Sequence, residues 1–261
     1  MMGPLNIVAI CRVPERREDA AATLAGITGL STYEAAARLR AGARLPVVVA
    51  VSRDPETAEV TAGRLTAEGF QALVLHHDEI VPEDGSFAVR RFFFEEGGLR
   101  VRSANGDTLS VDYRDFKVMV RGTCITRTSK TTVEKGRRFS LSRAVISGGL
   151  VMSRSTKRRR AETTESREGF FLLYAPRYNT LIFRETELVY TSLGPLLRPA
   201  RPENFATVVN ELRRRCPDLL FDESLVARSA QAQLLGPLFD PEEDLDIATS
   251  LLIRCLSMRQ V

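Results

Sequence analysis

Residues 28–74 restrict the fold most strongly, because segments typical of helices and of strands alternate there with a turn signal at each junction. Ser31 and Glu34 have the spacing of a capping box, in which two backbone N–H groups at a helix start are satisfied reciprocally. Asp54 followed by Pro55 is a second helix start, since proline at the first helical position loses no hydrogen bond. This pattern predicts a small domain that mixes helices and strands.

Flanking segments extend the pattern to a βααβαβ order over residues 5–78. The predicted strands are rich in Val, Ile and Leu, and the predicted helices end at glycines or at the next turn. The strands are expected at 5–13, 45–51 and 70–75, and the helices at 17–27, 31–42 and 54–69. We therefore predict an α+β protein whose first domain covers residues 1–80.

This domain resembles the C-terminal domain of the bacterial ribosomal stalk protein and the related ClpS adaptor fold. The resemblance lies in Thr28-Gly29-Leu30, Glu34-Ala35, Leu39, Pro46, Ala58, Leu65, Gly69 and Val74. It implies a domain that binds another protein through its paired helices, where the chain carries the candidate contacts Arg17, Arg38 and Arg40. The alternative is a small packing domain without a partner of its own.

A second domain is expected at residues 86–217, where short strands and turns replace the helices. Asn105-Gly106-Asp107 is a strong hairpin signal between two alternating segments. About seven antiparallel strands are expected, followed by one amphipathic helix. The strands are predicted at 87–94, 99–102, 109–113, 116–125, 170–174, 179–183 and 188–190, and the helix carries Phe205, Val208, Val209 and Leu212 on one face.

The second domain looks like a bacterial pleckstrin-homology-like domain, a bent antiparallel sheet closed by a helix. The resemblance lies in the segment 98–102, the Asn105-Gly106-Asp107 turn and the segment 111–116. Bacterial members of this group bind proteins or have no known ligand, so the resemblance implies no specific ligand.

Positive charge is concentrated in the middle of the chain. Residues 121–168 contain 13 Lys or Arg and 4 Asp or Glu, a local net charge of +9 in a chain whose total is +4. We expect a basic, mobile loop at 127–167, with a short helix at 140–146, that could contact nucleic acid or an anionic lipid surface. The candidate polyanion-binding residues are Arg137, Arg138, Arg143, Lys157, Arg158, Arg159 and Arg160. The alternative is a solvated loop that binds nothing.

A helical tail is expected at residues 218–261. Asp222 and Asp240-Pro241 are the predicted helix starts. Residues 251–256 are apolar enough to require a partner surface, either the chain's own sheet or a second copy in a homodimer.

Cysteine usage and hydropathy predict a cytoplasmic location. The four cysteines, at 11, 124, 216 and 255, are widely spaced and lack a C-x-x-C pair, so we expect buried free thiols rather than a zinc site or disulfides. No segment approaches the ~20 apolar residues that cross a bilayer.

No pattern in the chain specifies catalysis, a metal or a cofactor. Its two histidines, His76 and His77, are adjacent at a predicted strand end, so their side chains should point in opposite directions. We therefore predict a non-enzymatic adaptor or regulatory protein that binds another protein. The alternatives are a polyanion-binding protein that uses residues 127–167, and an enzyme without a recognisable motif.

Overall fold

The protein is described here from a computed structural model that covers residues 5–14, 19–42, 46–82, 85–139 and 153–258; for residues 126–164 it describes backbone elements only. The chain forms two compact units, one made of residues 1–124 and 168–261 and the other of residues 125–167. Helices and strands are both abundant, which confirms the predicted α+β class. The predicted boundaries at 80 and 217 do not separate compact units.

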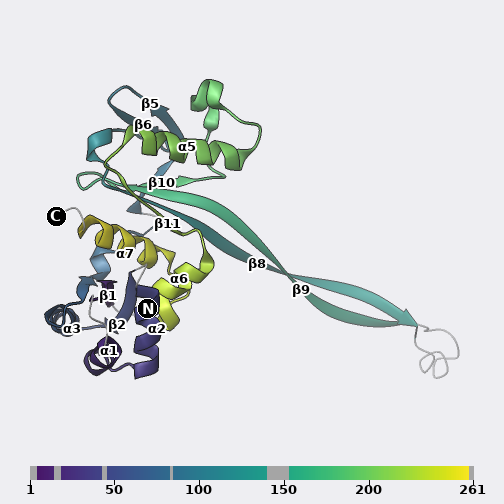
Figure 1. Ribbon diagram of the computed structural model, residues 1–261. Coiled ribbons are helices and arrows are strands. Elements are labelled where there is room, and N and C mark those ends of the chain that lie inside the picture. The colour runs from purple at the N-terminus through teal and green to yellow at the C-terminus, as the bar shows by residue number, and fades with distance from the viewer. Residues whose placement is uncertain (1–4, 15–18, 43–45, 83–84, 140–152, 259–261) are drawn as a thin grey trace. The chain divides into compact units, whose positions relative to one another are not determined.

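The βααβαβ order is confirmed at the start of the chain (Figure 1). Its elements are β1 (Asn6–Arg12), α1 (Ala20–Thr28), α2 (Thr32–Gly42), β2 (Val47–Ser52), α3 (Pro55–Ala67) and β3 (Gln71–Leu75). Ser31 and Glu34 form the expected capping box, with the Ser31 N–H donating to Glu34 Oε2 at 2.9 Å. The three strands form an antiparallel sheet, called sheet A, in the order β2-β1-β3.

Both faces of sheet A are buried, which explains why its strands are continuous apolar runs. One face carries Val8, Ile10 and Val49 and packs against α1, α2 and α3. The other face, with Ile7 and Ala9, shares a core with the C-terminal helices α6 (Arg228–Leu235) and α7 (Leu245–Ser257). The C-terminal segment is therefore part of the first domain's interior rather than a separate tail.

The middle of the chain forms two further sheets. Sheet B has the order β11-β8-β9-β10-β4, and sheet C is an antiparallel sheet in the order β5-β6-β7. The strands are β4 (Phe87–Val89), β5 (Arg91–Phe94), β6 (Gly98–Arg102), β7 (Thr108–Asp112), β8 (Val118–Phe139), β9 (Ser153–Tyr174), β10 (Leu181–Arg184) and β11 (Leu220–Leu225). The Asn105-Gly106-Asp107 turn joins β6 to β7 as predicted.

Sheet B departs from the predicted all-antiparallel domain. Two of its pairings, β4 with β10 and β8 with β11, are parallel. The single strand predicted at 87–94 is divided at Arg90, so that β4 joins sheet B and β5 joins sheet C. The strand predicted at 188–190 is wrong: Glu187 and Leu188 N–H both donate to Arg184 O in a turn, and the 3-10 segment η4 (Tyr190–Leu196) follows.

The C-terminal predictions were partly wrong. The helix expected to start at Asp222 forms only from Arg228 onward, as α6, because residues 220–225 form β11, whose parallel pairing with β8 supplies its backbone partners. A helix does form at α7, and its apolar side chains are buried within the protein. Docking on the chain's own sheets is thus confirmed, which removes those side chains from the expected homodimer contact.

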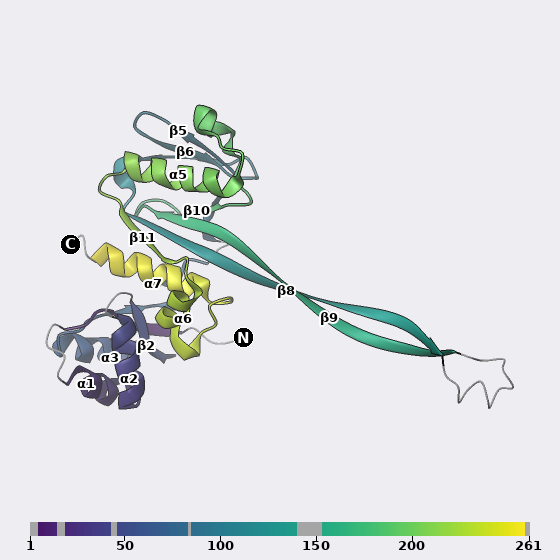
Figure 2. The ribbon, with the colours of Figure 1, turned by 45° about the vertical axis from the view of Figure 1, so that its right-hand side comes forward.

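Helix α7 lies between sheet A and sheet B, and its buried side chains join the two sheets into one core (Figure 2). Val118, Phe170 and Ile182 of sheet B belong to the same cluster of buried side chains as α7 and sheet A. On its other face, sheet B packs against α5 (Arg201–Arg215), where Phe205 lies 5.3 Å from Phe171 between ring centroids. The adjacent sheet C contributes to this second core.

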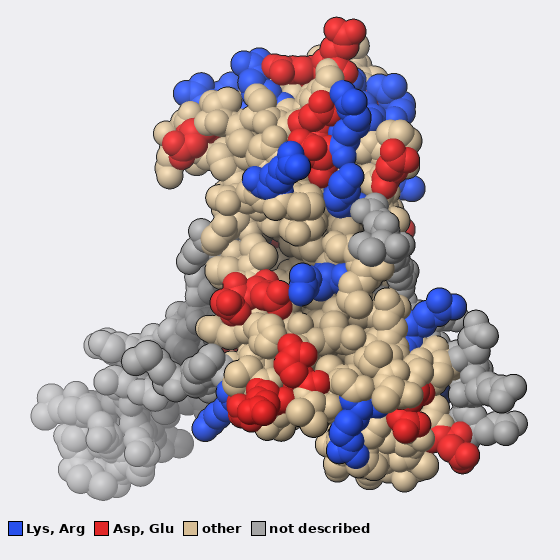
Figure 3. Space-filling view, turned by 90° about the vertical axis from the view of Figure 1, so that its left-hand side faces the viewer, with Lys and Arg blue, Asp and Glu red and all other residues tan. Residues whose placement is uncertain are grey.

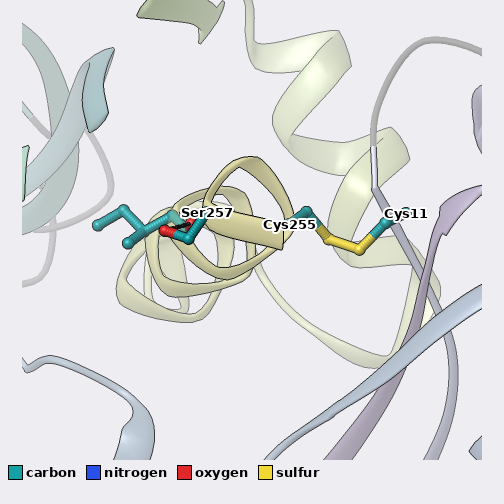
Figure 4. Close-up of a disulfide and its surroundings, with 4 residues drawn as sticks. Cys11, Cys255 and Ser257 are labelled. Atoms are coloured by element: carbon teal, nitrogen blue, oxygen red, sulfur yellow. Dashed lines mark hydrogen bonds between the residues drawn. A yellow bond between two sulfur atoms is a disulfide. The ribbon is translucent and has the colours of Figure 1, made fainter. Parts of the chain in front are cut away.

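A disulfide between Cys11 and Cys255 links β1 to α7 (Figure 4). Their Cα atoms are 5.6 Å apart, a separation well suited to a disulfide. The prediction of four free thiols was therefore wrong for this pair and correct for Cys124 and Cys216. Sequence spacing could not reveal the bond, because folding alone brings these two residues together.

Candidate functional site

The strongest charge feature is the second compact unit, residues 125–167, which we call the basic hairpin. It consists of the distal parts of β8 and β9, which are neighbours in sheet B and wind around each other in Figure 1. The two strand portions, 125–139 and 153–167, contain eleven Lys or Arg and three Glu. The expected loop is therefore replaced by strands at 125–139 and 153–167, where pairing of β8 with β9 supplies the backbone partners that a polar segment needs.

The proximal parts of both strands are firmly anchored in the first unit. The Phe170 ring packs directly on Gly122, where a Cβ atom would lie 2.5 Å from the ring. Glu168 accepts a hydrogen bond from Arg184 Nη1 at 3.1 Å and another from the Thr186 N–H at 3.1 Å. These contacts hold β8 and β9 side by side where they leave the first unit.

The predicted polyanion-binding residues fall mostly on the two strands. Arg137 and Arg138 lie in β8, and Lys157, Arg158, Arg159 and Arg160 lie in β9. Arg143, like the helix predicted at 140–146, lies outside the described residues. The structure thus places six of the seven candidates on one two-stranded element.

The first unit has no comparable concentration of one charge on the face that Figure 3 shows. Acidic and basic side chains are interspersed there. Elsewhere in the same unit, opposite charges pair directly, as in Arg254 with Glu79 at 3.0 Å and Arg214 with Glu211 at 2.8 Å. The chain outside the basic hairpin has a formal net charge of −5. Positive charge is therefore a property of the hairpin rather than of the whole protein.

One of the three arginines predicted to contact a partner on the paired helices is engaged within the protein instead. Arg38 Nη1 donates to Gln233 O near the end of α6 at 3.2 Å, and burial lowers the pKa of its guanidinium. Arg38 therefore stabilises the packing of α2 on α6 and is not a free partner contact. Arg40 is exposed, and Arg17 lies outside the described residues.

His76 joins three elements of the N-terminal fold. Its Nδ1 lies 2.9 Å from Asn6 Oδ1 and its Nε2 lies 3.0 Å from Glu59 Oε1. The Asn6 amide group in turn donates to Ser52 O and Arg53 O, which orients its oxygen towards the imidazole. The arrangement connects β1, α3 and the end of β3, and it agrees with the predicted position at a strand end.

A recess of about 260 Å³ beside β5 was not predicted. Its apolar lining consists of Phe93, Phe94, Leu193 and Leu196, and its polar residues include Glu211 and Arg215. Phe93 is 36% exposed and Leu196 is 44% exposed, although both are large apolar residues. The only sequence signal was the unusual Phe92-Phe93-Phe94 run.

A second recess, of about 200 Å³, lies between sheet B and the start of α7. Its apolar walls include Phe170, Leu172 and Ile182, and Asp246 is among its polar residues. Burial raises the pKa of the Asp246 carboxyl above its ordinary value. Asp246 Oδ1 accepts a hydrogen bond from the Ile247 N–H at 2.8 Å.

The described residues contain no group of three or more His, Cys, Asp or Glu that could hold a metal ion. Within the same part of the chain, none of the helices combines the length and apolar character that a bilayer span requires. Comparisons with protein-family models, curated proteins and solved structures found no match.

Proposed function

We propose that this chain is a non-enzymatic adaptor or regulatory protein that attaches to a polyanion through its basic hairpin. The observation that carries the proposal is the concentration of eleven Lys or Arg on two paired strands that contain only three Glu. The proposal combines the expected adaptor role with the expected polyanion binding, and transfers the main contact from the helices to the hairpin.

The hairpin has little to stabilise it as an isolated element. Only four of the thirty residues in its two strand portions are apolar, namely Ile125, Val133, Phe139 and Ala161. Two-stranded hairpins without a core are marginally stable in water, and concentrated like charge opposes compaction further. A polyanion would neutralise this charge, so binding and ordering of the hairpin should support each other.

Nucleic acid fits the hairpin better than a lipid surface. The DNA major groove admits a two-stranded β-ribbon, and each phosphate neutralised by Lys or Arg releases counterions. Stable attachment to a membrane interface instead requires apolar side chains that enter the acyl region. The four apolar residues of the strands are too few and too scattered to form such a face.

A cytoplasmic location remains part of the proposal despite the disulfide. Cys11 and Cys255 are only 4% and 1% exposed. Thiol–disulfide exchange requires access to a sulfur atom, so the folded protein shields this bond from soluble thiols.

Binding of the full-length protein to a fluorescent 24-base-pair duplex tests the proposal. The variant carries Lys157→Gln, Arg158→Gln, Arg159→Gln and Arg160→Gln, and we expect its affinity to fall by at least about tenfold at moderate salt, because up to four phosphate contacts are lost. The control variant removes four exposed charges from the first unit, through Arg40→Gln, Arg53→Gln, Arg64→Gln and Arg114→Gln, and should bind like the wild type.

Vesicles with and without phosphatidylserine separate the two polyanion classes. Duplex binding that is lost in the hairpin variant alone supports the proposal. Binding to anionic vesicles without duplex binding would replace nucleic acid with lipid as the partner. Equal losses in both variants would contradict a dedicated role for the hairpin.

A further inference from the structure

The recess beside β5 and the exposed face of sheet C together have the features of a binding surface that is separate from the basic hairpin. Two of the large apolar side chains that line this recess are exposed, Phe93 at 36% and Leu196 at 44%. Exposed apolar residues that gather around a concave site mark contacts with other molecules more often than isolated ones do.

The recess is preformed, because its walls are fixed by contacts within the protein. The Phe92 and Phe94 rings pack edge to face at 5.4 Å, and the Arg215 guanidinium lies 4.9 Å above the Phe94 ring. Arg215 also lies over the Tyr113 ring at 5.9 Å. A ligand would therefore find the apolar walls in place, without a cost of ordering them.

The Glu211 carboxylate beside the recess is paired with two arginines. Glu211 forms a hydrogen bond with Arg214 Nη2 at 2.8 Å and lies 3.4 Å from Arg215 Nε. The arginines lower the pKa of the Glu211 carboxyl, chiefly through the Arg214 hydrogen bond, so the group is anionic at neutral pH. Both arginines are therefore already engaged by a carboxylate, and the recess offers a ligand chiefly its apolar lining.

The open face of sheet C next to Phe93 carries cations in an unfavourable arrangement. Arg91 and Arg102 are directly opposite each other on β5 and β6, and both are exposed. Like charges in directly opposed positions destabilise a sheet. Neither arginine has an ion-pair partner among the residues that the structure describes. An anionic group bound from outside would relieve this repulsion.

Arg100 places a further cation at the aromatic edge. It lies opposite Phe93 in the sheet, with its guanidinium 4.9 Å from the centre of that ring, and it pairs with Glu95 at 2.7 Å. Phe93 thus contacts the Arg100 guanidinium, shares a face of the sheet with Arg91 and Arg102, and also lines the apolar recess. Aromatic residues and arginine are the types most enriched at protein–protein contacts.

We infer that this surface binds an acidic peptide segment of a partner protein that places a large apolar side chain in the recess. The apolar walls select a Phe or Leu side chain, and the opposed pair Arg91 and Arg102 selects neighbouring Asp or Glu. Together with the basic hairpin, such a site would let one chain hold a polyanion and a protein partner at once. This inference does not require the hairpin to bind, because no hairpin residue contributes to the surface.

Fluorescence anisotropy with synthetic ten-residue peptides tests the inference on the full-length protein. The probe has a central Phe-Leu pair flanked by Asp and Glu. One control peptide replaces the Phe-Leu pair by Ser-Ser, and the other replaces the acidic residues by Lys. We expect the probe to bind at least about tenfold more tightly than either control, since a filled pocket and charge complementarity both contribute.

Protein variants locate the site. Leu196→Ser and the double variant Arg91→Glu/Arg102→Glu should each weaken probe binding by about tenfold or more, as expected for central contact residues. Leu238→Ser changes an apolar residue that is 65% exposed elsewhere and should have no effect. The hairpin variant with four Gln substitutions should also bind the probe normally, which separates this site from nonspecific attraction to the hairpin.

Two results would overturn the inference. The first is equal binding of the probe and the Ser-Ser control, because the recess would then play no part. The second is probe binding that Leu196→Ser leaves unchanged and the hairpin variant abolishes, because the acidic residues alone would then be recognised.

Discussion

Removal of the Cys11–Cys255 bond should cost a large share of the protein's stability. The bond joins residues 244 positions apart, so it constrains nearly the whole unfolded chain. The chain-entropy relation gives an upper value of about 5.5 kcal/mol for a loop of this length, and measured losses are typically about 2–4 kcal/mol. We therefore expect the variant Cys11→Ala/Cys255→Ala to lose about 2–5 kcal/mol.

Urea unfolding followed by circular dichroism measures this loss. The wild type without reductant should unfold at the highest urea concentration. Dithiothreitol should reduce the bond once urea has opened the fold, so the wild type at equilibrium with dithiothreitol and the double alanine variant should unfold at similar lower concentrations, and reductant should not shift the variant further. Cys124→Ala serves as the control because this thiol is unpaired, and it should retain the wild-type response to reductant.

Thiol counting gives an independent check. The native oxidised protein should contain two free cysteines, Cys124 and Cys216, in place of the four that the sequence spacing suggested. A wild-type midpoint that dithiothreitol does not change, together with four alkylated cysteines in the unfolded, unreduced protein, would refute the bond.

Three further outcomes follow from the structure. Gly236→Ala should lower stability by at least about 1–3 kcal/mol in thermal unfolding, because φ is +75° and the added Cβ would collide with Arg38, whereas Gly26→Ala, in open space on α1, should not destabilise. Asp246→Asn should raise the unfolding temperature at pH 7. Burial raises the pKa of the Asp246 carboxyl, so the wild type loses stability as the pH rises and this carboxyl ionises, whereas Asn stays neutral. The difference in unfolding temperature between variant and wild type should therefore vanish below pH 3.8, the ordinary pKa of Asp. Burial raises the pKa of Cys216 to about 11, so iodoacetamide should modify it slowly at pH 8 and faster as the pH approaches that value, as mass spectrometry would show.

Local signals in the sequence predicted the N-terminal fold well. Ser31 with Glu34, and Asp54 with Pro55, mark helix starts by hydrogen bonds between residues at most three positions apart. The Asn105-Gly106-Asp107 turn similarly acts within one hairpin. Such signals remain valid whatever the rest of the chain does, which is why the element order at 5–78 was correct.

Long-range pairing could not be predicted in the same way. Strand β11 depends on β8, about 100 residues earlier in the chain, and Asp222 alone favoured a helix start. The covering of sheet A by α7 did leave a signal, because β1 is buried along almost its whole length and its sequence does not alternate. A strand of that kind needs a second covering layer, which the C-terminal helix provides.

The candidate sites show the same contrast between local sequence signals, which could be read, and contacts between distant segments, which could not. Charge counting alone identified the basic hairpin, because net charge is additive along the sequence. The paired strands that carry this charge were missed, since Ser, Thr, Lys and Arg without apolar residues are typical of loops. The recess beside β5 was missed because Phe93 and Leu196 meet only after sheet C and η4 are in place.

The salt dependence of duplex binding tests the central claim most directly. If six or more hairpin cations contact phosphates, the logarithm of the association constant should fall against the logarithm of salt concentration with a slope of about −5 or steeper. The variant with Gln at 157–160 should have a slope shallower by about 3–4, while the four-charge control of the first unit keeps the wild-type slope. A flat salt profile, or the same change of slope in both variants, would contradict the account.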